Sequence, residues 1–208
     1  MVREVDPAKT KRATAFEMWT KAPMPMVTIF KTLDVTKLIK LHKKRGYKFN
    51  MLICWCIGKA AAKMEEFYLL PVGEKLMQYD SLAINAVVKT KDGYISTCDI
   101  PFSEDLEQFN RDYLELTNKV FESCLPHDLG EGYMIIGTSN LAGHDIDGVV
   151  NIYAGFYNNP FMIWGGWRKK FFKTKLPISF QFHHSQMDGL EACEFLKRLQ
   201  NEINQING

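Results

Sequence analysis

The chain has 208 residues, a length typical of a single domain. Hydrophobic residues make up 46% and charged residues 24%, a composition that excludes a disordered or fibrous chain. The formal net charge is only +2, so we expect neither nucleic acid nor a membrane as a main partner. No apolar run approaches the roughly 20 residues of a membrane span, and the start of the chain lacks signal-peptide features. We therefore expect one domain over residues 1–208 in a soluble, cytoplasmic protein.

In the first half of the chain, the pattern predicts helices around a strand and a hairpin. The expected helices span residues 7–19, 35–44, 51–66 and 103–120, with Asp34 and Asn50 as N-caps of the second and third. The expected strands span residues 26–33, 82–89 and 93–99, the last two joined by a turn at residues 91–93. The helix over 103–120 is the most regular, because its apolar residues recur at intervals of three and four.

The second half is mostly extended. Four strands are expected at residues 133–139, 149–157, 160–167 and 176–183, followed by a closing helix at 190–206. Early helices, late strands and a closing helix together predict an α+β or mixed α/β fold around one large sheet. The five cysteines are an odd number without a CxxC pair, so we expect neither a disulfide framework nor a zinc site.

One segment, LPISFQFHHSQMDG, concentrates the chemistry. A buried-looking strand ends in His183 and His184, and Asp188 and Gly189 follow immediately before the closing helix. A strand end that meets a loop holds reactive groups in fixed positions. Neighbouring strand residues face opposite sides, so only one histidine can point into a given cleft. That histidine can accept a proton near neutral pH, and Asp188 could orient it or pair with a distant cation.

From the residues alone, three interpretations of this segment stay open. The first is a general base. The second is a hydrogen-bonded histidine in the core. The third, a metal site made by His183, His184 and Asp188, is disfavoured because the two rings face apart and only one acid is near.

The segment resembles the HHxxxDG signature of the chloramphenicol acetyltransferase family, which dihydrolipoamide acyltransferase cores and peptide-synthetase condensation domains share. Four further segments fall in the order shown by the family: Arg12-x-x-x-Phe16-x-x-Trp19, Tyr47-Lys-Phe-Asn50, CDIPFSEDLEQF, and Thr138-Ser139-Asn-Leu. The resemblance covers nearly the whole chain. It implies a single domain with a large mixed sheet flanked by helices, and a homotrimer with active sites at the subunit interfaces.

The resemblance also implies a role for each matched residue. His184 would be the general base that takes the proton of an acceptor hydroxyl as its oxygen attacks the thioester of acetyl-CoA. Ser139 would stabilise the oxyanion, unless it is a strand-end serine that bonds only to the backbone. Asp188 would form a structural ion pair with Arg12, unless Arg12 is an exposed helix charge.

Acceptor contacts are where the chain departs from the family. Trp19 stands where the family has a tyrosine, although it could serve packing alone. Tyr94 is a looser match to an aromatic contact. Ile163 replaces a threonine and cannot hydrogen-bond. These changes affect recognition of the acceptor more than the transfer chemistry. The sequence therefore supports acetyl transfer more strongly than it supports chloramphenicol as the acceptor.

The implied activity is transfer of acetyl from acetyl-CoA to a hydroxyl of chloramphenicol or a similar apolar alcohol, directly and without a metal, an antibiotic-resistance activity. We disfavour a dihydrolipoamide-type transacylase, since no lipoyl domain or Ala/Pro-rich linker is recognisable. A condensation-type enzyme would need two domains of this kind in one chain, about twice this length. A trimer that binds its ligand without turnover stays open: the altered pocket residues are a reason to keep it, whereas the intact His184, Asp188 and Ser139 argue against it.

Overall fold

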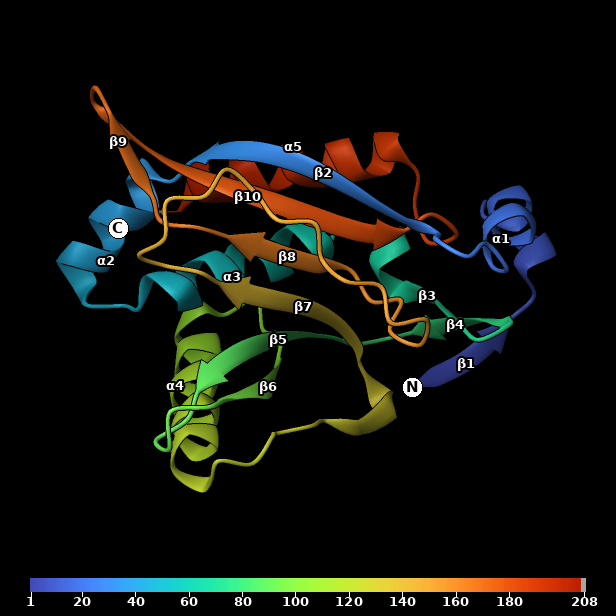
Figure 1. The fold of residues 1–208 in the computed structure, drawn as a ribbon, viewed down its shortest axis with the longest axis horizontal. Helices are drawn as coiled ribbons and strands as arrows, with labels where there is room; N and C mark the ends of the chain where they lie inside the picture. The colour runs from blue at the N-terminus through green and yellow to red at the C-terminus, as the bar shows by residue number, and fades with distance from the viewer. Residues whose placement is uncertain (207–208) are drawn as a thin grey trace.

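The computed structural model describes residues 1–206, which form a large sheet, a small sheet and the helices around them (Figure 1). The large sheet has seven strands, ordered β2-β10-β8-β7-β5-β6 with β9 paired to β10. Their bounds are β2 (Met26–Asp34), β5 (Leu82–Lys89), β6 (Ile95–Pro101), β7 (Met134–Asn140), β8 (Phe161–Trp164), β9 (Arg168–Lys170) and β10 (Lys173–His183). β7 runs parallel to β5 and β8, whereas the other pairs are antiparallel. The predicted mixed α/β fold is confirmed.

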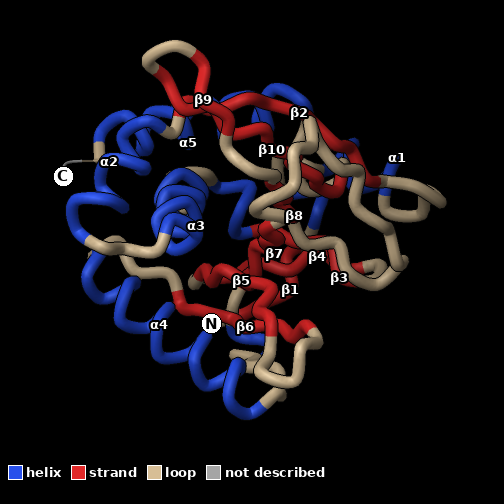
Figure 2. Tube along the Cα trace, turned by 60° about the vertical axis from the view of Figure 1, so that its left-hand side comes forward, coloured by secondary structure: helices blue, strands red, loops and turns tan. Residues whose placement is uncertain are grey.

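Helices cover one face of this sheet, and the connection over residues 141–160 crosses the other face (Figures 1 and 2). The helices are α2 (Thr36–Arg45), α3 (Phe49–Ala61), α4 (Leu106–Ser123) and α5 (Gly189–Gln205). The apolar α3 is buried from Met51 to Gly58, because it packs on the sheet and on α4 and α5. Within the described residues, no helix is both long and apolar enough to cross a membrane.

β10 divides its side chains between the two faces of the sheet. Phe180 and Phe182 point toward the helices and belong to the hydrophobic core, where Phe180 packs on Phe67 and Phe195. Ser179 and Gln181 alternate with them and therefore face the crossing connection. The sheet has an apolar helical side and a more polar side.

The predicted strand over residues 149–157 is wrong, because this stretch is a loop. Side chains of β10 satisfy its backbone in place of a ladder: Val149 N donates to Ser179 Oγ at 2.7 Å, and Gln181 Nε2 donates to Asn151 O at 3.1 Å. Gly155 has a φ of +82°, which breaks an extended run. Four of its large apolar side chains are instead exposed: Val150, Ile152, Phe156 and Tyr157.

The N-terminal helix is shorter than predicted. Residues Pro7–Lys9 form a 3-10 turn (η1), and the helix itself, α1, spans Ala13–Trp19. The interruption is at Thr10, which has extended backbone angles and caps η1. The third helix also ends early, at Ala61, and Asn50 lies inside it and donates to the Tyr113 hydroxyl at 2.9 Å rather than capping it.

A small antiparallel sheet is absent from the predictions. It has the order β1-β4-β3, with β1 (Val2–Val5), β3 (Leu69–Val72) and β4 (Lys75–Tyr79). Short 3-10 turns at Glu65–Tyr68 (η2) and Gly130–Gly132 (η3) complete the structure. This small sheet and α1 lie at the end of the large sheet where β10 stops (Figure 1).

Candidate active site

The HHSQMDG segment forms a tight turn between β10 and α5. His184 N donates to Pro25 O at 2.8 Å, which carries the β10–β2 ladder one step past the end of the strand. Gln186 N and Met187 N both bond to His183 O and reverse the chain. Asp188 is the N-cap of α5, and its N–H donates to the Glu191 carboxylate at 3.0 Å. The two flanking elements therefore fix the backbone of the turn.

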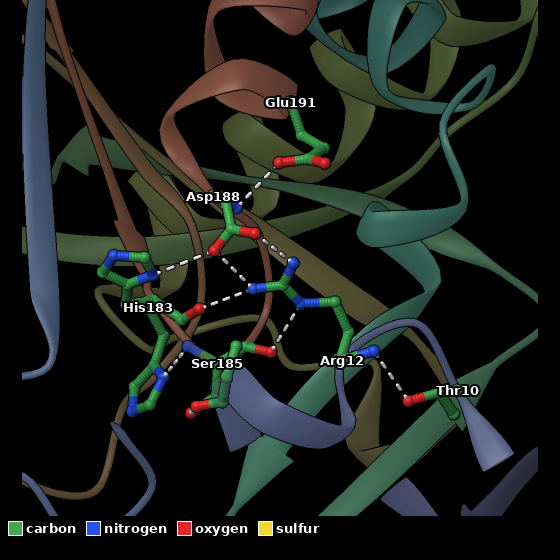
Figure 3. Close-up of polar contacts among 8 residues, drawn as sticks. Thr10, Arg12, His183, Ser185, Asp188 and Glu191 are labelled. Atoms are coloured by element: carbon green, nitrogen blue, oxygen red, sulfur yellow. Dashed lines mark hydrogen bonds and ion pairs between the residues drawn. The ribbon is translucent and has the colours of Figure 1, made fainter. Parts of the chain in front are cut away.

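Arg12 holds this turn from the N-terminal side (Figure 3). Its guanidinium makes two bonds of 2.8 Å to the Asp188 carboxylate, one to each oxygen. It also donates to Ser185 O at 3.1 Å and to His184 O at 2.8 Å. Arg12 is only 5% exposed, so it is a buried fork at the N-cap of α1 and not an exposed helix charge. The Arg12 hydrogen bonds hold the pKa of Asp188 below its usual value, and the same bonds raise the pKa of Arg12.

The His184 ring lies between Asp188 and Trp19. Its Nδ1 is 3.1 Å from Asp188 Oδ1, an electrostatic contact without the alignment of a good hydrogen bond. The indole of Trp19, the last residue of α1, stacks on the imidazole with ring centres 5.0 Å apart and planes inclined by 14°. A carboxylate can only accept, so the nitrogen beside it carries the hydrogen and Nε2 keeps its lone pair. This tautomer can accept a proton at Nε2.

His183 is placed differently. Its side chain is buried, and its Nδ1 accepts from Ser185 N at 3.1 Å. Burial, and to a lesser extent the neighbouring His184, lowers the pKa of His183 to about 4. His183 is therefore a neutral histidine that shapes the turn. Figure 3 shows it apart from the Arg12–Asp188 pair.

Two supporting residues escaped the sequence analysis. Gln186 is fully buried and donates to Leu69 O at 2.7 Å and to Glu66 O at 3.1 Å, which ties the turn to β3 and η2. Glu191 closes the N-terminus of α5. The Asp188-x-x-Glu191 spacing is a capping signal that the sequence already contains, whereas the partners of Gln186 lie in the small sheet that was not predicted.

Ser139 lies far from His184 within one chain. It pairs with Ile163 on β8, and Ile163 pairs with Ser179 on β10, five residues before His184. At about 3.3 Å per residue and about 4.8 Å between strands, the separation is roughly 15–20 Å. Thr138 contacts Cys54 of α3 on the helical side, so Ser139 and Ile163 face the side of the crossing connection. The structure places these two residues together but not beside His184.

Tyr94 is also remote from His184. It sits in the β5–β6 turn, is 75% exposed, and uses its carbonyl to accept from Thr90 N. Because β5 runs parallel to β7, this turn lies at the same end of the sheet as Ser139. Within one chain, the predicted site residues thus fall into two groups at opposite ends of the sheet.

A surface pocket of about 400 Å³ opens at the Ser139 end. It is lined by residues 142–145 of the crossing connection and by Gly166, Trp167 and Arg168. Trp167 packs edge-on against Phe49 at the start of α3, with ring centres 4.8 Å apart. The last turn of α2 carries the basic side chains His42, Lys43, Lys44 and Arg45. The aromatic wall suits stacking on the base of a nucleotide, and the basic last turn of α2 ends four residues before Phe49 in the sequence.

Comparison with known proteins identifies the family. The family model described as chloramphenicol acetyltransferase matches residues 2–200. The chain belongs to the chloramphenicol acetyltransferase family. It is 25% identical over 178 residues to chloramphenicol acetyltransferase 3 of Escherichia coli, covering 83% of each chain. Chloramphenicol acetyltransferase 2 of Escherichia coli is 27% identical over 174 residues, with 81% of each chain covered.

Solved structures agree on the fold. A chloramphenicol acetyltransferase structure superposes with a TM-score of 0.82 at 18% identity, covering 98% of this chain and 100% of the other. A probable dihydrolipoamide acetyltransferase from Listeria monocytogenes gives 0.73 at 14% identity, covering 99% and 94%. Membership of the family makes this chain an acyltransferase, and the enzymes of the family use acetyl-CoA.

Proposed function

We propose that this enzyme transfers the acetyl group of acetyl-CoA to a hydroxyl of chloramphenicol or a similar apolar alcohol. His184 Nε2 takes the hydroxyl proton while the alcohol oxygen attacks the thioester carbonyl. Ser139 donates a hydrogen bond to the oxyanion that forms. The intermediate then releases the CoA sulfur, which recovers the proton from the imidazolium. No covalent enzyme intermediate and no metal are needed.

The observation that carries this proposal is the way the chain holds one imidazole. Trp19 covers one face of the ring, the Asp188 carboxylate lies 3.1 Å from Nδ1, and the side chain stays 31% exposed. A general base needs a fixed ring, the correct tautomer and access to substrate. A histidine serving only the core needs none of these, and the neighbouring His183 provides that contrast.

The separation of Ser139 from His184 supports a site shared between copies of the chain. A single chain cannot bring the two residues to one reacting atom, whereas a neighbouring copy can supply the second. The face that carries Ser139 also exposes large apolar side chains, among them Val150, Ile152, Phe156 and Tyr157, which are 61–82% exposed. Contiguous exposed apolar side chains of this size are typical of subunit interfaces. We therefore infer an oligomer in which each site joins two subunits, and the resemblance to the family implies a homotrimer.

We infer that the pocket beside Trp167 receives the nucleotide end of acetyl-CoA. It opens at the strand end that carries Ser139, so a thioester extending from it would reach toward that hydroxyl. The acceptor side is less polar, because Ile163 lies beside Ser139 and cannot hydrogen-bond. This composition favours apolar alcohols over polyhydroxyl acceptors.

The decisive experiment measures CoA release from acetyl-CoA with chloramphenicol and a panel of apolar alcohols. We expect turnover with at least one acceptor, and a fall of about 10²–10⁴-fold in kcat for His184→Gln at unchanged fold. The change leaves the Arg12 fork intact, because that fork bonds to the backbone oxygen of residue 184.

Two results would overturn the proposal. Binding of an acceptor with no CoA release from any alcohol of the panel would identify a ligand-binding protein in place of an enzyme. Full turnover in His184→Gln would remove this histidine from the reaction. Turnover with other alcohols but not with chloramphenicol would keep the chemistry and exclude only the named acceptor.

A further inference from the structure

The hairpin of β9 and β10 is the most protruding feature of the fold. Lys170 pairs with Lys173, so only Phe171 and Phe172 form the turn between the strands. Figures 1 and 2 both show this hairpin projecting beyond the sheet and the helices. It belongs to neither group of predicted site residues.

The turn favours glycine where the chain has phenylalanine. Phe171 has a φ of +54°, in the left-handed region. The favoured two-residue hairpin turns, types I′ and II′, have a positive φ at the first central position, and a bulky side chain is disfavoured there. The Phe171 ring is therefore not explained by the geometry of the turn.

Packing within the chain does not explain the Phe171 ring either. Phe171 is 93% exposed and Phe172 is 99% exposed. Within residues 1–206, neither ring takes part in an aromatic contact or in the hydrophobic core. Two adjacent aromatic side chains are thus almost fully exposed to water. Exposure of this apolar area is unfavourable in free energy, and burial against the surface of a partner would relieve it.

Basic side chains surround the aromatic tip. The hairpin carries Arg168, Lys169, Lys170, Lys173 and Lys175. Arg168 is paired with Asp145 and Asp147, and Lys173 and Lys175 lie 3.5 and 3.4 Å from Asp34. Lys169 and Lys170 have no ion-pair partner in the described part of the chain. The tip therefore combines exposed aromatic area with uncompensated positive charge.

We propose that this hairpin docks the enzyme on an anionic lipid surface. The two phenylalanine rings enter the boundary between headgroups and acyl chains, and Lys169 and Lys170 contact the anionic headgroups. A convex tip without flanking walls suits a flat, deformable surface better than a shaped protein groove. The overall charge of +2 does not reveal this feature, because the positive charges are concentrated on one projection.

The test is co-sedimentation of the intact protein with vesicles of phosphatidylcholine alone or mixed with phosphatidylserine. We expect binding to the mixed vesicles, weakened by salt. The double variant Phe171→Gly, Phe172→Ser should reduce the partition coefficient at least tenfold, and Lys169→Ala, Lys170→Ala should do the same. Glycine fits the φ of residue 171, so the first variant should fold at least as well as the parent, which thermal unfolding checks.

Matched controls separate the hairpin from general surface effects. Ile95→Ser, Leu125→Ser removes two exposed apolar side chains elsewhere, and Lys40→Ala, Lys119→Ala removes two exposed charges. Neither control should change vesicle binding. The proposal is overturned if the parent protein does not bind the mixed vesicles, or if both hairpin variants bind them as strongly as the parent does. It is equally overturned if the hairpin variants change only the oligomeric state, because the tip would then be a subunit contact.

Discussion

His183 and His184 are adjacent in sequence yet differ in every property that matters for chemistry. The first is buried, accepts a backbone N–H and has a pKa that burial lowers to about 4, whereas the second is partly exposed and contacts Trp19 and Asp188. The alternation of a strand already assigns them to opposite sides. Which side is the reactive one cannot be read from the residues alone, because it depends on Arg12 and Trp19, near the other end of the chain.

The low pKa of His183 predicts a loss of stability in acid. The ordinary value of 6.5 applies to the unfolded chain, so that chain binds the proton more readily than the folded one, with its pKa of about 4. Stability is therefore lost as the pH falls from 6.5 toward 4. At pH 5 the loss from this group amounts to about 2 kcal/mol.

Replacing His183 isolates this contribution. Asparagine places an acceptor near the position of Nδ1, so His183→Asn keeps the bond from Ser185 N without a titrating group. The measurement is the free energy of unfolding at pH 7 and pH 5, at one fixed protein concentration for both proteins. The parent should lose about 2 kcal/mol more than the variant. Equal losses would show that His183 is not the buried, neutral group described above.

At the scale of elements, α1 and α5 meet through one ion pair. Arg12 precedes α1 and Asp188 caps α5, so their contact sets both helices against the end of β10. Lysine cannot replace Arg12 here, because one ammonium group cannot reach the carboxylate and two carbonyl oxygens together. The pair is a positioning device for His184.

Arg12→Ala should remove two hydrogen bonds from the Asp188 carboxylate and one from each of two carbonyl oxygens. We expect a loss of about 2 kcal/mol in stability, moderated because the Asp188 side chain is 46% exposed. Turnover should fall about 10–100-fold through kcat with little change in KM, since the ring is displaced and the pocket is not. Arg12→Lys should recover only part of both losses.

Steady-state kinetics and thermal unfolding of both variants check this prediction. A double-mutant cycle with Asp188→Asn should show strong coupling. Additive effects in the cycle would show that Arg12 and Asp188 act independently of each other. A lowered melting temperature with unchanged kcat would make the pair structural only.

The elements that sequence patterns predicted well are those with complete local signals. The apolar spacing of α4, the β5 strand and the Gly93 turn, where φ is +90°, all agree with expectation to within a few residues. The failures have physical causes. β3 and β4 are too short to show alternation, and β3 contains Pro71. The 149–157 loop has the apolar pattern of a strand, but its backbone forms hydrogen bonds with the side chains of Ser179 and Gln181 and not with a neighbouring strand.

At the scale of the whole molecule, the two groups of site residues predict complementation between inactive subunits. His184→Ala and Ser139→Ala should each be nearly inactive alone. In a mixed trimer, one interface can combine His184 of one subunit with Ser139 of its neighbour. Every trimer that contains both variants has about one interface in three with both residues intact, hence about a third of the parent activity.

Co-expression of the two variants with different affinity tags, followed by purification on both, provides the sample. The activity of the mixed assembly is compared with that of each variant alone. No recovery in a verified mixed trimer would place both residues in one subunit and contradict the shared site. A fully active monomer would do the same.

The same candidate site also depends on how far synthesis of the chain has progressed. Arg12 leaves the ribosome early, but the carbonyl and carboxylate that it holds follow 173 and 176 residues later. Domains begin to fold while they are being made, so this guanidinium stays without these partners until the chain has been synthesised through Asp188. Catalytic competence thus requires the segment through Asp188, and a product of premature termination before α5 would be inactive however well its remaining sheet assembled.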